Sequence, residues 1–103
     1  MDREKAIKYM HDLLRLMKAK DASDLYIAAG AAPSMKIHGR LEQVSGQKLS
    51  PAHTQVLARS IMNDKQAAEF DATNECNFAI SLPGVSRYRI SAYVQRSSVA
   101  MVV

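Results

Sequence analysis

Two arginines stand close together on a predicted β-strand near the end of the chain. The segment VSRYRISAYVQR, residues 85–96, alternates polar and apolar side chains, which is typical of a strand with one buried face. Tyr88 and Ile90 lie on the apolar face, whereas Arg87 and Arg89 lie on the polar face, about 6.6 Å apart. The segment contains no acidic residue. Paired planar guanidinium groups suit phosphate oxygens, so the strand is either an anion site or an ordinary exposed sheet face.

Ser23 and Asp24 form a second polar pair, at a predicted junction between a helix and a strand. Short polar side chains at such a junction often bind nearby backbone groups, which would make the pair structural. An aspartate in such a corner could also hold an arginine from elsewhere in the sheet. We therefore expect Ser23 and Asp24 to have structural or interface roles, and we assign Arg96, at the end of the arginine strand, to the same class.

The side chains that most often bind metals or act as nucleophiles are dispersed along the chain. His11, His38 and His53 fall in three different predicted elements and Cys76 in a fourth, without a short ligand spacing such as C-x2-C. Neither a nucleophile–base signature nor a G-x-x-x-x-G-K-[ST] phosphate loop occurs. The sequence therefore predicts no metal site and no catalytic residue, and it disfavours an ATP hydrolase acting alone. Cys76 is predicted to be a core thiol.

Length and composition indicate one soluble globular domain. The 103 residues are 48% apolar and 23% charged, and no apolar run approaches the roughly 20 residues that a membrane span needs. A single cysteine cannot form an internal disulfide, which fits a reducing cytoplasm. The net charge of +4 is spread along the chain, and this disfavours a nucleic-acid site, which would cluster its basic residues.

Apolar periodicity and turn residues predict three helices and six strands. Ser50 is expected to cap a helix that has Pro51 in its first turn, and Asp64 to cap the next helix. The order α-β-β-β-α-α-β-β-β predicts an α+β fold, with an antiparallel sheet and helices packed on one face. The predicted helices cover about 3–20, 51–62 and 64–73, and the strands cover 24–30, 35–38, 41–44, 76–82, 85–96 and 97–103.

Several motifs together resemble a known family. The stretches SDLYI followed by PSMKIHG, and ECNFAIS followed by SRYRISAYVQR, resemble the N-terminal domain of the type IV pilus retraction ATPases of the PilT/PilU kind. These enzymes belong to the secretion ATPase superfamily, and the resemblance covers essentially the whole chain. ECNFAIS and the closing QR are more similar to the PilU-like branch. The motifs are individually weak, but their order and spacing are fairly specific.

The resemblance implies a PAS-like domain, residues 1–103, from a longer protein whose RecA-like ATPase domain is absent here. It implies that six chains form a ring, that the parent protein uses ATP and Mg²⁺, and that hydrolysis drives pilus retraction in twitching motility. By motif position, Arg89 would point toward the nucleotide phosphates, with Arg87 beside it as the weaker candidate. The implied location is cytoplasmic, at the inner membrane, with the membrane platform and a paralogous motor as possible partners. The chain also ends within a predicted strand, AMVV, which we interpret as a cut inside a longer protein.

Two further functions stay open from the residues alone. The domain could be a protein-interaction module that binds pilus components without touching nucleotide, its arginines pairing with carboxylates of a partner. A small basic nucleic-acid-binding domain is the third hypothesis. The resemblance does not distinguish a retraction motor from an accessory motor that works beside it.

Overall fold

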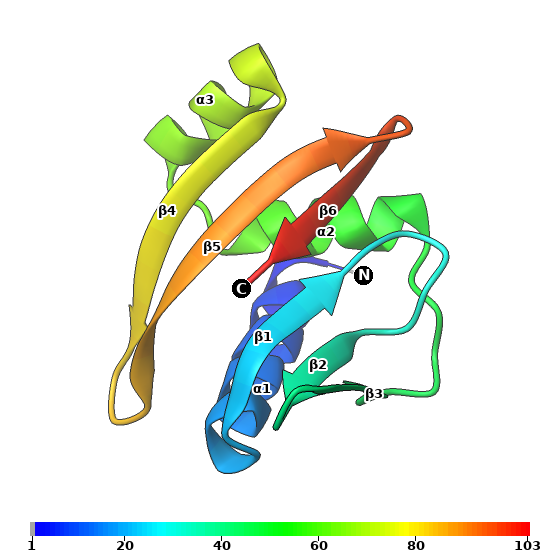
Figure 1. The fold of residues 1–103 in the computed structure, drawn as a ribbon. Coiled ribbons are helices and arrows are strands. Elements are labelled where there is room, and N and C mark those ends of the chain that lie inside the picture. Colours follow the sequence, from blue (N-terminus) through cyan, green and yellow to red (C-terminus); the bar gives the residue numbers. More distant parts are fainter. Residues whose placement is uncertain (1) are drawn as a thin grey trace.

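Two antiparallel meanders meet at the centre of one six-stranded sheet in the computed structural model, which describes residues 2–103 (Figure 1). The strand order is β3-β2-β1-β6-β5-β4, so the first and last strands of the chain are neighbours. The α+β class and the order of elements are therefore confirmed. The elements are α1 (Arg3–Ala19), β1 (Ala22–Ile27), β2 (Ser34–Ile37), β3 (Arg40–Gln43), α2 (Pro51–Ser60), α3 (Asp64–Thr73), β4 (Glu75–Leu82), β5 (Ser86–Gln95) and β6 (Ser98–Val102).

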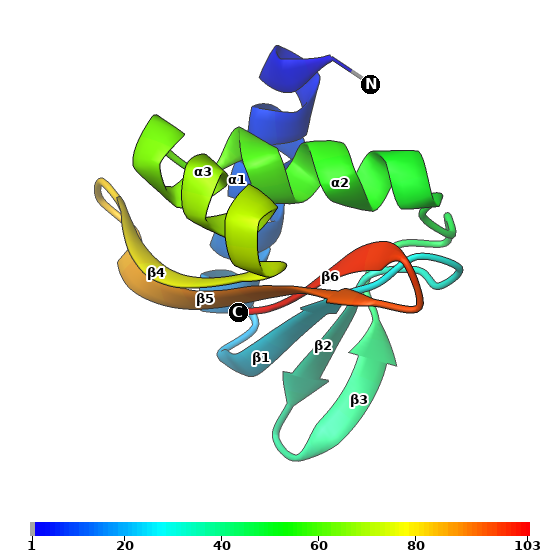
Figure 2. The ribbon, with the colours of Figure 1, turned by 90° about the horizontal axis from the view of Figure 1, so that it is seen from above.

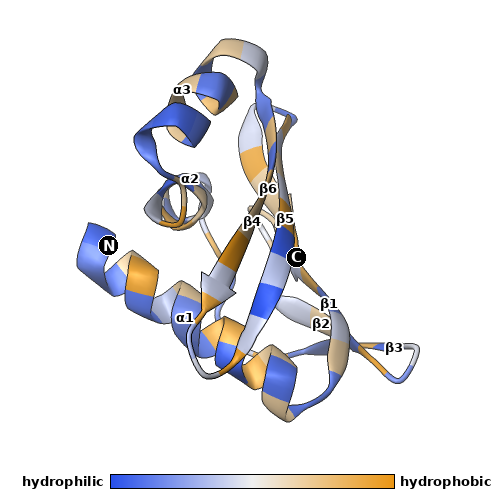
Figure 3. Ribbon diagram, turned by 90° about the vertical axis from the view of Figure 1, so that its left-hand side faces the viewer, coloured by the Kyte–Doolittle hydropathy of each residue, from blue (hydrophilic) through white to orange (hydrophobic). Residues whose placement is uncertain are grey.

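All three helices cover the same face of the sheet, as predicted (Figure 2). Helix α2 packs on both α1 and β6, and α3 packs on β4. In Figure 3 the helices lie on one side of the sheet, and the other face of the strands has no helix over it. That uncovered surface is called the open face below. Among residues 2–103, no helix has the length and apolar content that crossing a bilayer requires.

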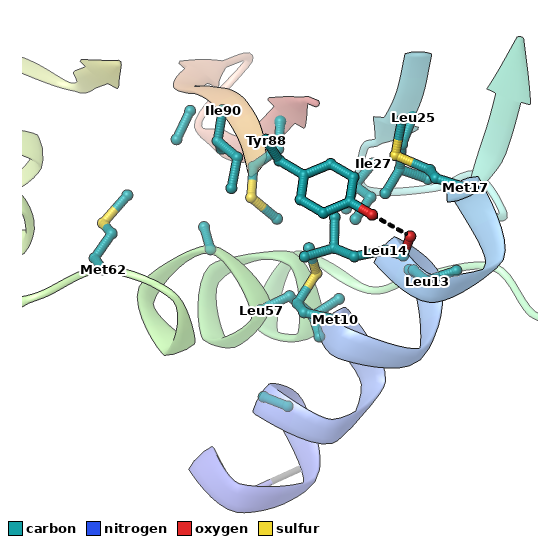
Figure 4. Close-up of a cluster of buried hydrophobic side chains, with 14 of the residues drawn as sticks. Met10, Leu13, Leu14, Met17, Leu25, Ile27, Leu57, Met62, Tyr88 and Ile90 are labelled. Carbon is teal, nitrogen blue, oxygen red and sulfur yellow. Dashed lines mark hydrogen bonds between the residues drawn. The ribbon is translucent and has the colours of Figure 1, made fainter. Parts of the chain in front are cut away.

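The core lies between the helices and the sheet (Figure 4). Met10 and Leu14 of α1 are fully buried, as the helical periodicity predicts, and they pack with Leu57 of α2 and Ile90 of β5. The hydroxyl of Tyr88 donates a hydrogen bond of 2.7 Å to the carbonyl oxygen of Leu14. This bond satisfies the one polar atom that Tyr88 brings into the core, and it joins β5 to α1.

Two helix caps were predicted, and one of the two was wrong. Ser50 does cap α2: its hydroxyl accepts a hydrogen bond from the backbone N–H of His53. Helix α3 is capped by Asn63 instead of Asp64, because the Asn63 side chain accepts from the N–H of Gln66 at 2.8 Å. The Gln66 side chain returns a bond to Asn63, a reciprocal pair that Asp64, already in the first turn, could not form.

The first strand also differs from its prediction. β1 begins at Ala22, two residues before the predicted start, and ends at Ile27 instead of residue 30. Between Ala22 and Asp24 its pairing with β2 shifts by one residue, which marks a β-bulge at Ser23. The bulge is the local feature that sets where Ser23 and Asp24 lie.

Candidate functional site

The arginine strand has the orientation that its alternation predicted. Tyr88 and Ile90 are buried on the helix-covered side, whereas Arg87 and Arg89 are exposed on the open face of β5. In Figure 3, strongly hydrophilic positions on β5 alternate with paler ones. On the neighbouring strand β4, Arg87 pairs with Ser81 and Arg89 pairs with Ala79. Neither cross-strand neighbour carries a charge.

Neither arginine forms an ion pair within the described part of the chain. The ion pairs of residues 2–103 join Lys8 and Arg15 to Asp12, and Arg59 to Asp71. Arg59 and Asp71 pair through two contacts, at 2.6 and 3.3 Å, and this bond raises the pKa of Arg59. The guanidinium groups of Arg87 and Arg89 are therefore free to meet an anion from outside this part of the molecule.

Arg89 borders a hollow of about 440 Å³ on the sheet. Asp24, Asn77 and Ser91 supply its other polar side chains, and Val102 and Val103 border it at the end of β6. We call this the Arg89 hollow. Arg87 does not line it. The hollow thus places one cation, one carboxylate and two neutral hydrogen-bonding side chains at one site, drawn from β1, β4 and β5.

Ser23 and Asp24 lie together at the bulge. The Ser23 hydroxyl donates to the Oδ2 atom of Asp24 at 2.9 Å and also lies 3.3 Å from the carbonyl oxygen of Lys36 on β2. This hydrogen bond orients the Asp24 carboxylate, which is half-buried and borders the Arg89 hollow. The sequence raised the idea that Asp24 holds an arginine from elsewhere in the sheet. Asp24 and Arg89 both line the hollow, but within residues 2–103 no ion pair joins them.

Arg96 is not part of this group. It lies in the turn between β5 and β6, where Arg96 and Ser97 have φ values of 52° and 64°. It borders a different, smaller hollow of about 220 Å³ with Ala28 and Ala29. Seven residues of strand separate it from Arg89, about 23 Å along β5. Its predicted structural or interface role remains a prediction.

The histidines and the cysteine do not come together in one cluster within residues 2–103. No group of three or more His, Cys, Asp or Glu side chains that could hold a metal ion occurs within residues 2–103. His53 accepts a hydrogen bond at Nδ1 from the N–H of Ser50, 3.5 Å away, in the cap of α2. Cys76 is 2% exposed, as expected of a core thiol. Burial, and secondly the carboxylate of Glu69 at 3.6 Å, raise the pKa of its thiol.

Two residues of the hollow were missed by the sequence analysis. Ser91 shares the polar face of the arginine strand, but no role was attached to it. Asn77 was placed only within a strand, although the pairing Asn77–Ser91 puts the two side by side. Alternation along both strands could have suggested this pair, whereas the bulge at Ser23 has no signal in the sequence.

Comparison with known proteins places these features in a family context. No family model matches the chain. The chain is 48% identical over 91 residues to the type IV pilus ATPase PilU of Pseudomonas aeruginosa, and 33% identical over 84 residues to the type IV pilus retraction ATPase PilT of the same organism. These matches cover 88% and 82% of the chain, but 24% of each relative. A twitching motility protein of Neisseria gonorrhoeae is 27% identical over 81 residues, which are 79% of the chain and 22% of that protein.

A crystal structure of the pilus retraction motor PilT with bound ADP is also similar, with a TM-score of 0.75 and 32% identity. The similarity covers 87% of this chain and 27% of the PilT chain. The chain is an N-terminal domain of the PilT/PilU type. The ATPase DotB of Legionella pneumophila has the same fold, with a TM-score of 0.77 at 20% identity over 93% of this chain and 28% of DotB. The chain spans about a quarter of the length of these relatives.

Proposed function

We propose that this PilT/PilU-type domain is the N-terminal part of a motor ATPase that acts on type IV pili in twitching motility. The support is its similarity to relatives named as pilus ATPases and as a twitching motility protein. Within that motor, we propose that the domain binds and senses nucleotide without catalysing its hydrolysis. Catalysis would belong to the RecA-like domain that the family resemblance implies.

One observation carries the nucleotide-binding proposal: Arg87 and Arg89 are adjacent, exposed and without ion pairs within residues 2–103. Two uncompensated guanidinium groups favour an anion brought to the open face from outside. ATP phosphates held by another domain are that anion. Arg89 is the principal contact because it borders a hollow that can admit a phosphate group, and Arg87 is the secondary contact.

The proposed assembly is a hexamer in which this domain packs against a neighbouring subunit. The parent protein would use ATP with Mg²⁺, and this chain would address the phosphates through its arginines. We place the motor in the cytoplasm, peripheral to the inner membrane, where the pilus platform and a paralogous motor are candidate partners. Ser23, Asp24 and Arg96 are proposed to stabilise the domain or its interfaces.

Substitution of Arg89 in the full-length protein tests the proposal. Arg89→Ala is expected to weaken ATP-dependent turnover or ATP affinity by about tenfold or more, because a lost charge-assisted contact costs about 1.5–3 kcal/mol. Arg40→Ala is the matched control, since Arg40 is also exposed but lies on β3, at the opposite edge of the sheet from β4. Both variants should keep the unfolding midpoint of this domain. Equal turnover and ATP affinity in the two variants would remove Arg89 from nucleotide binding.

The second candidate function is a protein-interaction module that binds pilus-machinery partners without nucleotide contact. It is favoured by the edge strand β3, where Leu41 is 67% exposed and borders a shallow hollow with Tyr26 and Lys36. Association with a partner that depends on salt but not on nucleotide, and that Leu41→Ser weakens, would support this function over the first.

A further inference from the structure

The outer edge of β3 has no neighbouring strand within residues 2–103. β3 is the last strand on its side of the sheet, and its four residues, Arg40–Gln43, are all exposed. Figures 2 and 3 show the β2–β3 hairpin projecting away from the helices. An edge of this kind presents unpaired backbone N–H and C=O groups, to which another strand can bind. The edge is therefore available to a strand from a second molecule.

The pairing of β3 with β2 fixes which backbone groups of β3 face outward. Just after the strand, the N–H of Val44 donates to the carbonyl oxygen of Pro33 at 3.0 Å, so the backbone of Val44 faces inward. This direction alternates from one residue to the next along an antiparallel pair. The backbone groups of Leu41 and Gln43 therefore face outward, whereas those of the alternate residues of β3 face β2.

One antiparallel register between two copies of β3 matches both charge and apolar character. Antiparallel pairing places outward-facing residues opposite outward-facing residues. With the two-fold axis at Leu41, Leu41 lies opposite its own copy, and Arg40 lies opposite Glu42 of the second copy, twice over. An axis at Arg40 or at Glu42 would place like charges opposite each other, and an axis at Gln43 would pair neither charge. The strand is thus complementary to itself in the register centred on Leu41.

The side chains on both faces of β3 suit this register. Leu41 is 67% exposed and borders a shallow hollow with Tyr26 and Lys36 on the open face, where a second Leu41 would cover apolar surface. Arg40 and Glu42 lie on the opposite face of the strand and form no ion pair within residues 2–103. Each would meet the opposite charge across the axis, and such cross-strand pairs are favourable.

We propose that two copies of this chain pair along β3, antiparallel and centred on Leu41, so that one sheet continues through both copies. Charges on an exposed edge normally discourage pairing with other strands. In β3 the order of the charges makes a second copy of the same strand the exception. The contact involves few residues, so we expect a weak dimer with a dissociation constant of about 0.1–1 mM.

This inference rests on the interaction surface of the second candidate function, for which it names a partner, and it does not depend on nucleotide binding. The pairing is isologous, because the same strand contributes from both copies. It is therefore separate from the contact of the proposed hexamer, since a ring is closed by repeating one heterologous contact.

The first experiment is an NMR concentration series on the 103-residue chain, which encloses its own core. Between about 0.05 and 2 mM, a range that spans the expected dissociation constant, the signals of residues 40–43 should shift. Exchange of the Leu41 N–H with water should slow by about twofold or more, because pairing buries it. The N–H of Glu42 already faces β2, so its exchange should not change. Leu41 exchange that is the same at all concentrations would overturn the inference.

The second experiment exchanges the charges. Arg40→Glu places acids opposite acids and Glu42→Arg places bases opposite bases, so each variant alone should self-associate about tenfold more weakly than the wild type. An equimolar mixture of the two variants should associate as the wild type does, because the acidic strand of one faces the basic strand of the other. Lys65→Glu, the same charge change at an exposed position of α3, is the matched control and should dimerise normally.

Two results of the charge exchange would overturn the proposed register. One is a mixture that associates no better than the single variants. The other is Arg40→Glu that associates as well as Lys65→Glu, since the dimer would then not depend on β3.

Failure of this inference is distinguishable from failure of the proposed functions. If the wild type stays monomeric but Leu41→Ser still weakens binding to a pilus component, the second candidate function stands and self-pairing is refuted. If the copies pair as predicted and no pilus component binds β3, self-pairing stands and that candidate function fails. The Arg89 test is made at micromolar protein, where β3 pairs are not populated, so Arg40→Ala remains a suitable control there.

Discussion

Arg87 and Arg89 share a strand face, yet their surroundings differ. Arg89 borders a hollow with Asp24, Asn77 and Ser91, whereas Arg87 pairs with Ser81 and does not line that hollow. A phosphate at Arg89 could therefore also receive hydrogen bonds from neutral side chains, and a phosphate at Arg87 would have fewer partners. This difference is our physical reason for ranking Arg89 first.

Arg87→Ala in the full-length protein should accordingly have a weaker effect than Arg89→Ala. We expect ATP affinity to fall by about threefold to fivefold, in the range of a single exposed ionic contact. Fluorescence titration with a labelled ATP analogue would measure this difference, again with Arg40→Ala as the control. An effect of Arg87→Ala that equals or exceeds that of Arg89→Ala would reverse the ranking.

Two buried groups that lose a proton at high pH, a thiol and a tyrosine hydroxyl, make the stability of the domain depend on pH. Burial raises the pKa of both the Cys76 thiol and the Tyr88 hydroxyl. The folded chain keeps these protons at a pH where the unfolded chain has lost them. Stability is therefore fully present below the unfolded pKa values and declines as the pH rises above about 9, by at most about 1.4 kcal/mol per pH unit for each group.

Urea unfolding between pH 7.5 and 10.5 would measure this decline. Cys76→Ala should be less stable at pH 7.5 because a core side chain is shortened, but its stability should fall less steeply between pH 9 and 10. If the wild type and the variant lose stability at the same rate over that interval, the thiol does not keep its proton in the folded state.

At the scale of single elements, local sequence signals predicted some features correctly and left others undecided. Helix α2 could be predicted because Ser50, Pro51 and the apolar stripe are all local signals. The alternation of β5 was equally local, and it gave the correct face for both arginines. The cap of α3 was misassigned because Asn63 and Asp64 are both good cap residues, and only the bond from Gln66 decides between them.

Substitution at the two positions would verify the corrected cap of α3. Asn63→Ala should lower the free energy of unfolding by about 1 kcal/mol, because the N–H of Gln66 loses its acceptor. Asp64→Ala removes only a favourable charge near the helix N-terminus and should cost about 0.3–0.5 kcal/mol. Thermal unfolding followed by circular dichroism compares the two, and a larger loss in Asp64→Ala would restore the original prediction.

At the scale of the whole molecule, the candidate site depends on a pairing that no local pattern reveals. The residues that line the Arg89 hollow come together because β6 pairs with both β1 and β5, which lie far apart in the sequence. The sequence indicated Asp24 and Arg89 separately as residues of interest, one at a corner and one on a strand. Their common level in the sheet follows from the register of Val102 with Tyr26 and Ser91, which depends on the packing of the complete domain.

The layering of the whole molecule fits the proposed role of this domain beside a separate nucleotide-holding domain. The helices cover one face of the sheet (Figure 2). Arg87 and Arg89 are exposed on the other face, where we propose that a second domain presents nucleotide. The PilT structure with bound ADP, similar over 87% of this chain, is the natural framework in which to examine that arrangement.

The most direct measurement is the distance from the Arg89 guanidinium to the nucleotide in the full-length protein. A structure of that protein with a non-hydrolysable ATP analogue would provide it. The proposal predicts an Arg89 nitrogen about 2.7–2.9 Å from a phosphate oxygen, the length of a charge-assisted hydrogen bond. An Arg89 side chain paired with a protein carboxylate, with every phosphate oxygen beyond direct contact, would contradict nucleotide binding and favour the interaction module.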